Sequence, residues 1–446
     1  MRRMDPPDVL VLGGGLAGLA AAVDLAQKGA RVTLLEKRAV LGGRASSTMD
    51  RKTGHSVDNG HHALMGCYRH TLDFLQKIGT RDKVIFQKSL ALDFCEPGCS
   101  SLRLSCPKLP GPFHLLFGLF GYGALTIREK IQLLRAGIKL TNNKLPPDMT
   151  VSTWLALETQ TPKSIKYFWE PLVLATLNAH LTSASVRLLA KVFEQGLAAG
   201  PRASALGFST VGLTHLYADD AARVIMKNKG HIERSQAVYQ IIIKQGIARG
   251  VRLSDGTILQ AGVVISAIPY FSLYPILPPD LTRAGGYFNY LTQLRSSPIL
   301  SIHLWLDRVI TSLPWAALLG TEIQWVFNKA KLFLPGEGDY LSLTLSAADR
   351  YVKKNKEQLV KMALEDLRKL FPEARKARVK HSVAFMERNA TLSADPKTRS
   401  LRPGVQTDIS GFLLAGDWVD TGLPATMESA VLSGQKAADL ILQQKS

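Results

Sequence analysis

The first forty residues alternate between short apolar runs and glycine-rich turns. Residues 9–12 are wholly apolar and predict a buried parallel strand. An alanine-rich run over residues 19–28 stops at Gly29 and predicts a helix. A second apolar run, residues 31–35, predicts another strand and is followed by the acidic Glu36. Strand, helix and strand in this order predict a βαβ unit.

Blocks of helical and strand periodicity alternate along the rest of the chain. Helical spacing predicts helices over residues 68–79, 126–140, 151–200, 221–226 and 351–371, and a last helix through residue 442. Apolar runs or strict alternation predict strands over residues 236–244, 263–269, 298–306, 322–327 and 411–418. Alternation in two of these, residues 298–306 and 322–327, indicates a sheet with one face turned to solvent or to a ligand.

Three glycines join the first strand to the first helix with the spacing G-x-G-x-x-G. Gly13 permits a tight turn, Gly15 lets the backbone approach a pyrophosphate, and Gly18 lets helix and strand pack closely. The helix N-terminus offers free N–H groups to phosphates. Glu36, 18 residues past the last glycine, can accept hydrogen bonds from a ribose hydroxyl. The whole constellation predicts a dinucleotide site.

Two further signals select the dinucleotide. The segments GGGLAGLAAA, Glu36 and GGR at residues 42–44 resemble the flavoprotein superfamily of amine oxidases and phytoene desaturases, whose first forty-odd residues hold FAD. Near the other end, the run GFLLAGDW predicts a buried strand leading into Gly416-Asp417, before the last helix. The resemblance implies FAD as cofactor, held by Gly13, Gly15, Leu16, Ala17, Gly18, Glu36, Lys37, Gly42, Gly43, Arg44, Gly416, Asp417, Ala425, Thr426 and Met427.

The implied fold is α/β, with a Rossmann-like FAD-binding domain and a discontinuous second substrate domain made of a mixed β-sheet and helices. A chain of 446 residues has room for both cores. We predict FAD-binding segments over residues 1–100, 205–290 and 385–446. The substrate domain is predicted to take a helical, membrane-facing part over 101–204 and a sheet and helix over 291–384.

Four cysteines do not form a disulfide framework in a chain of this length, which favours a reducing compartment. The spacing of Cys95, Cys99 and Cys106 matches no zinc pattern, and no metal site is predicted. The initial MRRM imitates a secretory signal, but acidic residues and prolines interrupt it. With no run of 18 apolar residues either, we expect a cytoplasmic protein.

The chain carries 55 Lys and Arg against 36 Asp and Glu, a net charge of +19. The basic residues are scattered and no nucleic-acid-binding module is recognisable, so nucleic acid is not predicted as a partner. An anionic membrane surface or a phosphorylated pathway neighbour suits the charge better. A merely soluble basic protein is the alternative.

A membrane-touching segment is predicted at residues 109–140. The run PGPFHLLFGLFGYGAL is strongly apolar but too short to span a bilayer, and Lys108 and Arg128 flank it. Thr126-Ile127-Arg128-Glu129 reads as a capping box that starts the following helix. Interfacial insertion at the inner face of the cell membrane fits this pattern. A helix buried in the substrate domain is the alternative.

Over nearly its whole length the chain resembles the hydroxysqualene dehydroxylase family. The resemblance rests on VDNGHHALMGCYRHTLDFL, FWEPLVLATLN, SPILSIHLWLD, QWVF and LLAGDWVDTGLPATMESAVLSG. It implies an FAD-dependent oxidoreductase of squalene and hopanoid biosynthesis that replaces the hydroxyl of hydroxysqualene, a lipophilic isoprenoid, with hydride. Neighbouring squalene-pathway enzymes are then candidate partners.

Loss of hydroxide from an allylic alcohol requires a proton donor and a dry, apolar pocket. Asp58, His61 and His62 are the catalytic candidates, although the turn they occupy also fits a loop with two satisfied histidines. Three alternatives share the superfamily: a carotenoid desaturase of the phytoene type, a flavin amine oxidase, and a prenyl-binding escort protein without flavin. Intact Glu36, Gly42-Gly43-Arg44 and Gly416-Asp417 argue against the escort protein.

Overall fold

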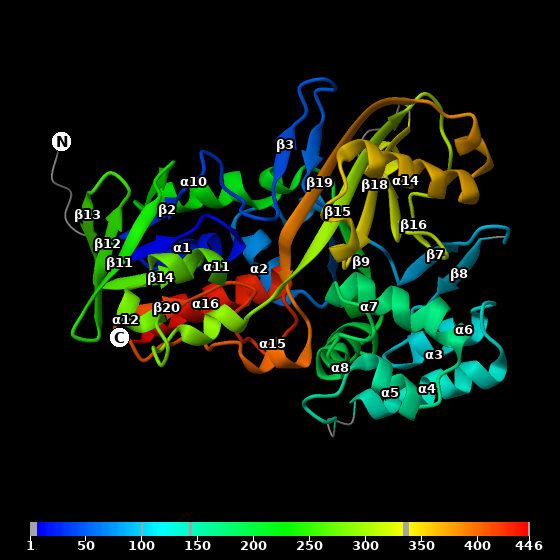
Figure 1. The fold of residues 1–446 in the computed structure, drawn as a ribbon, viewed down its shortest axis with the longest axis horizontal. Coiled ribbons are helices and arrows are strands. Elements are labelled where there is room, and N and C mark those ends of the chain that lie inside the picture. Colours follow the sequence, from blue (N-terminus) through cyan, green and yellow to red (C-terminus); the bar gives the residue numbers. More distant parts are fainter. Residues whose placement is uncertain (1–6, 100, 142–144, 333–338, 445–446) are drawn as a thin grey trace.

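The computed structural model describes residues 7–99, 101–141, 145–332 and 339–444, and shows two domains side by side (Figure 1). One domain, at the left of Figure 1, holds a parallel sheet and both described ends of the chain. The other holds a long mixed sheet with a group of helices below it. The initial MRRM, on which no targeting peptide is predicted, lies outside the described residues.

The parallel sheet collects strands from three distant parts of the chain. Its order is β10-β2-β1-β14-β20, and every neighbouring pair is parallel. The strands are β1 (Val9–Leu12), β2 (Val32–Glu36), β10 (His231–Arg234), β14 (Val263–Ser266) and β20 (Phe412–Leu414). Because β2 and β14 lie on opposite sides of β1, the order reverses there, and ligands of such sheets bind at this switch point.

Closely packed helices cover the parallel sheet. Helix α1 (Leu16–Gln27) packs on α10 (Asp219–Lys227) and on α16 (Met427–Gln443), where a Cβ on Gly434 would lie only 2.1 Å from the Ala17 carbonyl oxygen. The antiparallel strands β11 (Val238–Lys244), β12 (Ile247–Leu253) and β13 (Ile258–Gln260) form a separate small sheet. Gly256, with φ of +87°, lies in the turn between the last two.

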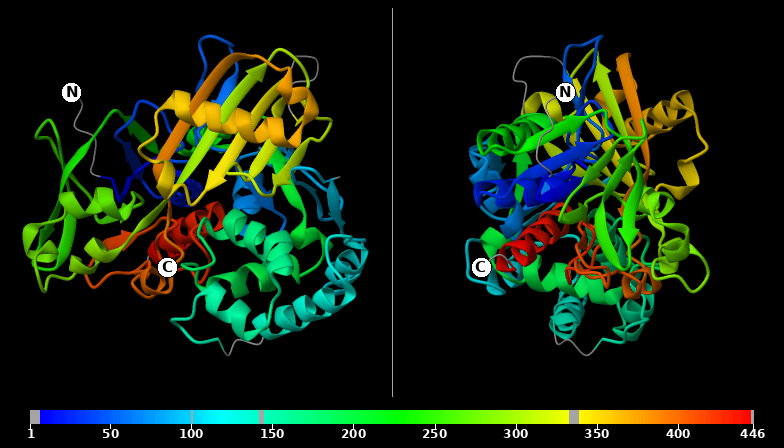
Figure 2. Two further views of the ribbon diagram at one scale, coloured as in Figure 1. Left: turned by 45° about the vertical axis from the view of Figure 1, so that its right-hand side comes forward. Right: turned by 90° about the vertical axis from the view of Figure 1, so that its left-hand side faces the viewer.

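The second domain is built on a seven-stranded sheet of order β19-β15-β18-β17-β16-β7-β8. Its strands are β7 (Ala91–Cys95), β8 (Leu102–Ser105), β15 (Ser296–Leu306), β16 (Trp315–Leu318), β17 (Trp325–Asn328), β18 (Asp339–Ser346) and β19 (Val379–Leu392). Leu300, Ile302 and Leu304 face an apolar core shared with α14 (Lys356–Leu370), which lies across this side of the sheet (Figure 2). The alternate residues face the other side, so the predicted two-faced sheet is confirmed.

Helix α14 begins five residues later than predicted. The sequence predicts a helix from residue 351, whereas Asn355 forms a capping box with Gln358 and helix geometry starts at Lys356. The side-chain oxygen of Asn355 accepts from the Gln358 N–H at 2.9 Å. The cap satisfies an N–H group that the first helical turn leaves without a partner, and this fixes the boundary.

The helices below the sheet include α3 (Phe113–Gly121), α4 (Ile127–Thr141), α5 (Val151–Leu157), α7 (Glu170–Leu177) and α8 (Val186–Val192). Thr126 and Glu129 form the predicted capping box of α4. Non-helical segments at residues 158–161 and 178–185 break the helical run that apolar spacing predicts over 151–200. Two π-helical turns, Ile165–Trp169 and Phe193–Leu197, continue the α-helices beside them. No described helix has the length and apolarity needed to cross a bilayer.

Two predicted domain boundaries fall within continuous elements. The β7–β8 hairpin spans the boundary at residue 100 and belongs to the seven-stranded sheet. The boundary at residue 384 falls inside β19, whose 14 residues run from the second domain toward the first. The remaining described strands form two small sheets. One pairs β3 (Ser47–Met49) with β4 (Ser56–Asp58), and the other joins β5 (Ala63–Met65), β9 (Leu206–Ser209) and β6 (Val84–Phe86).

Candidate active site

Two glycine turns face each other at the C-terminal end of β1. Gly13 and Gly43 have positive φ of +101° and +62°, which favours glycine there. A Cβ on Gly43 would lie 3.1 Å from the α-carbon of Gly15, while a Cβ on Gly15 would meet nothing closer than 3.9 Å. Backbone therefore faces the cavity on both sides, as a pyrophosphate cradle requires.

Gly18 has the packing role that the spacing predicts. A Cβ there would lie 2.0 Å from the Gly13 carbonyl oxygen, so a larger residue would force α1 away from β1. Gly18 lies behind the turn and does not line the cavity. Its contribution to a nucleotide site is to hold the helix N-terminus in place.

Glu36 is fixed at the end of β2 by two backbone donors. Its carboxylate accepts from the Gly14 N–H at 2.7 Å and from the Arg38 N–H at 2.9 Å. The side chain is buried but lines the cavity. Each carboxylate oxygen has a second lone pair, so the group can also accept from ribose hydroxyls.

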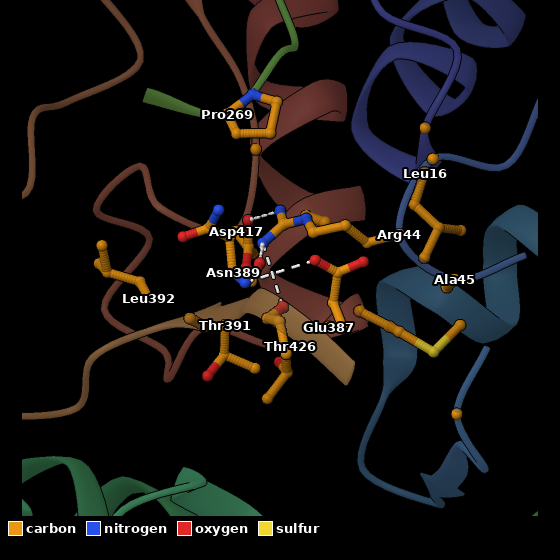
Figure 3. Close-up of a pocket in the computed structure, with 18 of the residues that line it drawn as sticks. Leu16, Arg44, Ala45, Pro269, Glu387, Asn389, Thr391, Leu392, Asp417 and Thr426 are labelled. Atoms are coloured by element: carbon orange, nitrogen blue, oxygen red, sulfur yellow. Dashed lines mark hydrogen bonds and ion pairs between the residues drawn. The ribbon is translucent and has the colours of Figure 1, made fainter. Parts of the chain in front are cut away.

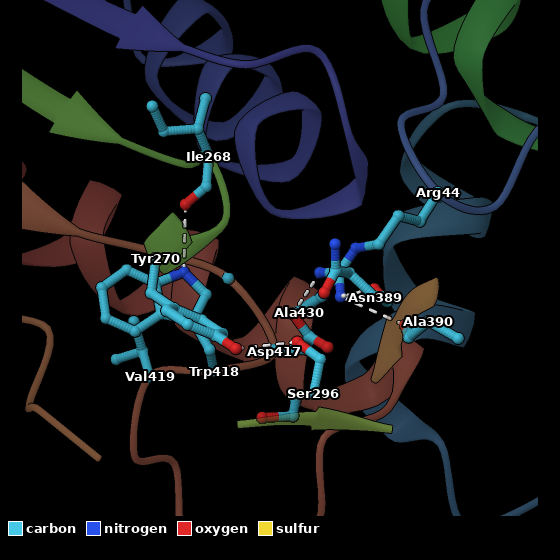
Figure 4. A network of polar contacts seen from close by, with 12 residues as sticks. Arg44, Ile268, Tyr270, Ser296, Asn389, Ala390, Asp417, Trp418, Val419 and Ala430 are labelled. Carbon is cyan, nitrogen blue, oxygen red and sulfur yellow. Dashed lines mark hydrogen bonds and ion pairs between the residues drawn. The ribbon is translucent and has the colours of Figure 1, made fainter. Parts of the chain in front are cut away.

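An ion pair joins the two ends of the chain beside this cradle. Arg44 donates to the carboxylate of Asp417, which follows β20, and to the Ala390 carbonyl oxygen of β19 at 3.1 Å (Figure 4). Burial opposes the charge of Arg44, but the carboxylates of Asp417 and Glu387 outweigh it and raise its pKa. The guanidinium stays charged, as a phosphate-binding group must.

Arg402 shapes the segment that carries Asp417. Its buried guanidinium donates to the carbonyl oxygens of Asp417 at 2.8 Å, Val419 at 2.5 Å and Leu423 at 2.5 Å. This segment leads into α16, where Thr426 caps the first turn by accepting from the Ser429 N–H at 3.4 Å. Arg402 thereby directs the positive end of the helix dipole toward the cavity.

Tyr217 holds the second glycine turn from behind. It lies in a π-helical turn, Thr214–Ala218, and its hydroxyl is 2.6 Å from the carbonyl oxygens of both Gly42 and Ala45. Tyr217 is fully buried. These contacts fix the backbone on either side of Gly43 and Arg44.

A single cavity of about 900 Å³ runs from the glycine cradle into the second domain. Figure 3 shows the part of its lining around Arg44, Asp417 and Thr391. Every residue predicted to hold FAD lines it except Gly18. Sequence reasoning missed other lining residues at the glycine-cradle end of the cavity, which come from the entry to β11 and from the segment before β20: Gln236, Ala237, Val238, Arg399 and Arg402.

The far end of the cavity is aromatic. Phe208 packs on Trp315 with ring centroids 4.6 Å apart, and His61 stacks on Phe327 at 3.7 Å. Trp325 and the aliphatic side chains of Leu177 and Leu188 complete this wall. The charged lining residues lie at or next to the glycine-cradle end: Glu36, Lys37, Arg38, Arg44, Glu387, Arg399, Arg402 and Asp417. The far end thus suits an uncharged, apolar ligand.

Asp58 lies behind this wall, in a buried network. Its carboxylate binds the Lys329 ammonium at 3.0 Å and accepts from the Ser47 hydroxyl at 2.7 Å and the Leu213 N–H at 3.1 Å. Burial acts to raise the pKa of Asp58, but Lys329 and the two other donors outweigh it and lower the pKa. Asp58 is therefore held as a carboxylate, and it does not line the cavity.

His61 and His62 both line the cavity, and burial lowers the pKa of each. The Lys329 charge lowers the pKa of His61 further, whereas the hydrogen bond to Gly60 works against the shift at His62. His62 Nδ1 lies 2.8 Å from the Gly60 carbonyl oxygen, which assigns its proton to Nδ1 and leaves Nε2 to accept. Both imidazoles are neutral near pH 7.

No metal centre is present among the parts of the chain that the structure describes: no group of three His, Cys, Asp or Glu residues there could hold an ion. The cysteines at 95, 99 and 106 are free thiols, and burial raises the pKa of Cys95 and Cys106 to about 11. These two are thus poor nucleophiles and poor ligands.

Comparisons with known proteins agree with this geometry. The family described as flavin containing amine oxidoreductase matches residues 16–442. The chain is 27% identical to hydroxysqualene dehydroxylase of Zymomonas mobilis, covering 97% of this chain and 98% of that one. It is 24% identical to zeta-carotene desaturase of Synechocystis, covering 97% of both. A crystal structure of an oxidoreductase from Methanosarcina mazei matches with a TM-score of 0.75, at 20% identity, over 97% of this chain and 99% of that one.

Proposed function

We propose that this chain, which belongs to the flavin containing amine oxidoreductase family, removes the hydroxyl group of a long isoprenoid alcohol by reduction. Membership of the family makes it an FAD-dependent oxidoreductase with the predicted α/β fold. The substrate proposed is hydroxysqualene and the product squalene. Similarity to hydroxysqualene dehydroxylases along nearly the whole chain supports this substrate.

The described residues fit FAD. A cradle of facing glycines suits the pyrophosphate, since a Cβ on Gly43 would crowd Gly15. Arg44 suits the phosphate charge, and Glu36 and Asp417 offer carboxylate oxygens to ribose and ribityl hydroxyls. The N-terminus of α16, at Thr426 and Met427, lines the same cavity and favours negative charge on the ligand. We propose that these residues hold FAD as the sequence predicts.

One observation carries the proposed substrate: the FAD cradle and an aromatic chamber are parts of the same cavity. Phe208, Trp315 and Phe327 wall the chamber, and the charged lining lies elsewhere. An isoprenoid chain gains free energy by leaving water for such a surface. An ammonium substrate would find no carboxylate among these aromatic residues, which disfavours amine oxidation.

The overall reaction exchanges one bond for another. The alcohol loses its C–O bond, gains a C–H bond, and consumes one hydride and one proton to release water. Bound reduced FAD supplies the hydride. The protein contributes an apolar chamber that excludes bulk water, which would otherwise capture the delocalised allylic cation.

His62 is the proposed proton donor. It lines the cavity, its Nδ1 is bound to Gly60, and Nε2 is the ring atom left to carry and deliver a proton. A lowered pKa makes the imidazolium form a stronger acid toward the leaving hydroxyl. His61, flat against Phe327, shapes the chamber. Asp58, held as a carboxylate by Lys329, orients the turn that carries both histidines.

An exposed aromatic surface on α3 supports the proposal that the protein touches a membrane and takes a lipid-borne substrate from it. Phe113, Phe117 and Phe120 lie at i, i+4 and i+7 and are 53%, 55% and 42% exposed. Ile127 and Ile138 of α4 are also exposed, and Arg128, Arg135 and Lys139 lie on that helix with exposed side chains. Aromatic residues beside cations are typical of interfacial insertion into anionic membranes. Lys130 instead turns inward and donates to the Phe120 carbonyl oxygen at 2.7 Å.

We therefore place the enzyme in the cytoplasm, bound peripherally to the inner face of the cell membrane, in squalene and hopanoid biosynthesis. The test is anaerobic incubation of the reduced holoenzyme with hydroxysqualene, followed by mass spectrometry. Formation of squalene supports the proposal. A carotenoid desaturase would instead remove hydrogen from a polyene when its flavin is oxidised, and that result would overturn the proposal.

A further inference from the structure

Three hydroxyl groups on the cavity side of the seven-stranded sheet have no hydrogen-bond partner among the described residues. They belong to Ser301 of β15 and to Ser342 and Thr344 of β18. Ser301 and Ser342 are fully buried, and Thr344 is 9% exposed. Buried hydroxyls without partners are rare in folded proteins, and each one needs an explanation.

Sheet register brings these hydroxyls together. Ser301 is the direct partner of Thr344 across the antiparallel β15–β18 pair, and Ser342 lies one position along the same face, opposite His303. Residues directly opposite in such a pair have β-carbons about 5 Å apart. His303 cannot serve Ser342, because its two ring nitrogens are bound to the Asp58 carbonyl oxygen and to the Tyr340 hydroxyl, each at 3.0 Å.

Other hydroxyls on the same face show that the sheet can satisfy such groups. Asn178, at the end of α7, accepts from the Ser297 hydroxyl through its carbonyl oxygen at 2.7 Å. Its side-chain amide donates to the Thr391 hydroxyl at 2.9 Å. No equivalent side chain among the described residues reaches Ser301, Ser342 or Thr344. Among the described residues of this sheet, buried hydroxyls without a partner thus occur only beneath the aromatic chamber, whereas Ser297 and Thr391 have partners.

The three hydroxyls lie next to the aromatic end of the cavity. Thr344 lines the cavity itself, beside Trp325 on β17. A Cβ on Gly60 would lie 3.4 Å from the Ser301 hydroxyl and 3.5 Å from His62 Cε1, so Ser301 and His62 flank the same glycine. Trp315, also on the cavity wall, has an indole N–H without a partner among the described residues.

We infer that Thr344, with Ser301 and Ser342 beside it, forms a subsite that binds the hydroxyl group of an isoprenoid alcohol. Hydroxyls can donate and accept at once, so they match an alcohol oxygen, which does the same. A hydrocarbon of the same length leaves every one of these groups without a partner. The site therefore distinguishes the alcohol from the hydrocarbon by the hydroxyl group and not by molecular shape.

The subsite deepens the proposed function and rests on it, since it places the leaving oxygen of the substrate next to His62. It also makes a separate claim, about binding alone. Affinity for the alcohol must exceed affinity for the matched hydrocarbon even when the flavin is oxidised and no turnover can occur. Ordered water satisfying the three hydroxyls is the competing explanation, and it predicts no such preference.

The test uses the oxidised holoenzyme and the probe pair hydroxysqualene and squalene, with binding followed by the absorbance of the bound flavin. Thr344→Val removes the hydroxyl and keeps the shape, Thr344→Ser keeps the hydroxyl and serves as the matched control, and Ser301→Ala is combined with Thr344→Val. We expect the wild-type protein to prefer the alcohol about tenfold, a typical value for hydrogen bonds of this kind. Most of that preference should disappear in the double variant, while squalene affinity stays within about twofold.

The outcomes separate the two proposals. An unchanged preference in the double variant, with squalene still formed from hydroxysqualene by the reduced wild type, overturns the subsite and leaves the proposed function standing. A preference that Thr344→Val abolishes, with no squalene formed under reducing conditions, supports the subsite and overturns the proposed reaction. Squalene affinity reports on the fold of each variant, because it does not depend on the hydroxyls.

Discussion

Arg44 and Asp417, 373 residues apart in the chain, form a partly buried ion pair beside the glycine cradle. Each closes the site from a different end of the sequence, and Arg402 holds the segment that carries Asp417. Asp417→Ala would remove the carboxylate partner of the Arg44 charge and the proposed acceptor for FAD hydroxyls. We expect FAD affinity to fall about tenfold or more, a loss typical of a hydrogen bond to a charged group.

Fluorescence titration of the apoprotein with FAD measures this loss. Arg103→Ala is the matched control, because it breaks the ion pair of Arg103, whose side chain is 60% exposed, with Asp93 on the β7–β8 hairpin. Surface pairs contribute little, so the control should bind FAD as the wild type does. An Asp417→Ala protein with wild-type FAD affinity would show that the two ends of the chain do not share the flavin.

The Asp58–Lys329 pair predicts a strongly non-additive effect on stability. Both side chains are more than nine-tenths buried, so Lys329→Met leaves an uncompensated carboxylate and should lower the free energy of unfolding by about 3–5 kcal/mol. In the double variant Asp58→Asn/Lys329→Met no charge is left behind, and most of that loss should be recovered. Urea unfolding of the single and double variants measures both values. Equal losses of unfolding free energy in the single and the double variant would contradict the interpretation that Asp58 and Lys329 form a buried ion pair.

Proton delivery by His62 predicts the direction of the pH dependence. The pKa of His62 lies below its usual 6.5, so the protonated fraction decreases throughout the range above pH 6.5. Turnover should fall by up to about tenfold per pH unit between pH 6.5 and 8.5. His62→Gln cannot be protonated and should lose both most of its activity and this slope. His61→Gln, the control, should keep the slope.

Single-turnover rates on a pH series provide the measurement. A wild-type rate that rises with pH over this range would exclude an imidazolium donor. A His62→Gln variant with the wild-type slope would assign the proton to another group.

The exposed phenylalanines of α3 predict a loss of membrane affinity on substitution. Burying a phenylalanine side chain contributes about 1.5–3 kcal/mol, so Phe117→Ser and Phe120→Ser together should weaken binding to vesicles containing anionic lipid by at least tenfold. Co-sedimentation measures this. Tyr239→Ser, which alters a residue of β11 that is 65% exposed, is the control and should bind as before. If the wild type, the double variant and the control bound vesicles equally, α3 would not be part of a membrane-binding surface.

The glycine cradle could be predicted because its signals are local. Strand β1, the glycines at 13, 15 and 18 and Glu36 lie within 28 residues, and each has a fixed steric or hydrogen-bonding role. Period-two alternation likewise predicted the two-faced sheet at β15 and β17. Boundaries were less accurate where a cap decides them, as at Asn355.

Long-range contacts could not be predicted, since no local pattern records which distant side chains meet. Lys329 reaches Asp58 across 271 residues, and Tyr217 reaches Gly42 across 175. The cluster of Ser301, Ser342 and Thr344 depends on the register of β15 against β18, and a slip by one residue would turn those side chains to the opposite face. The π-helical turn that aims Tyr217 also has no periodic signature in the sequence.

The most direct test of the account is an anaerobic stopped-flow experiment in which reduced holoenzyme meets hydroxysqualene. We predict that the absorbance of oxidised flavin returns in step with squalene formation, with one squalene formed for each flavin oxidised. A flavin that stays reduced beside unchanged hydroxysqualene would contradict the account.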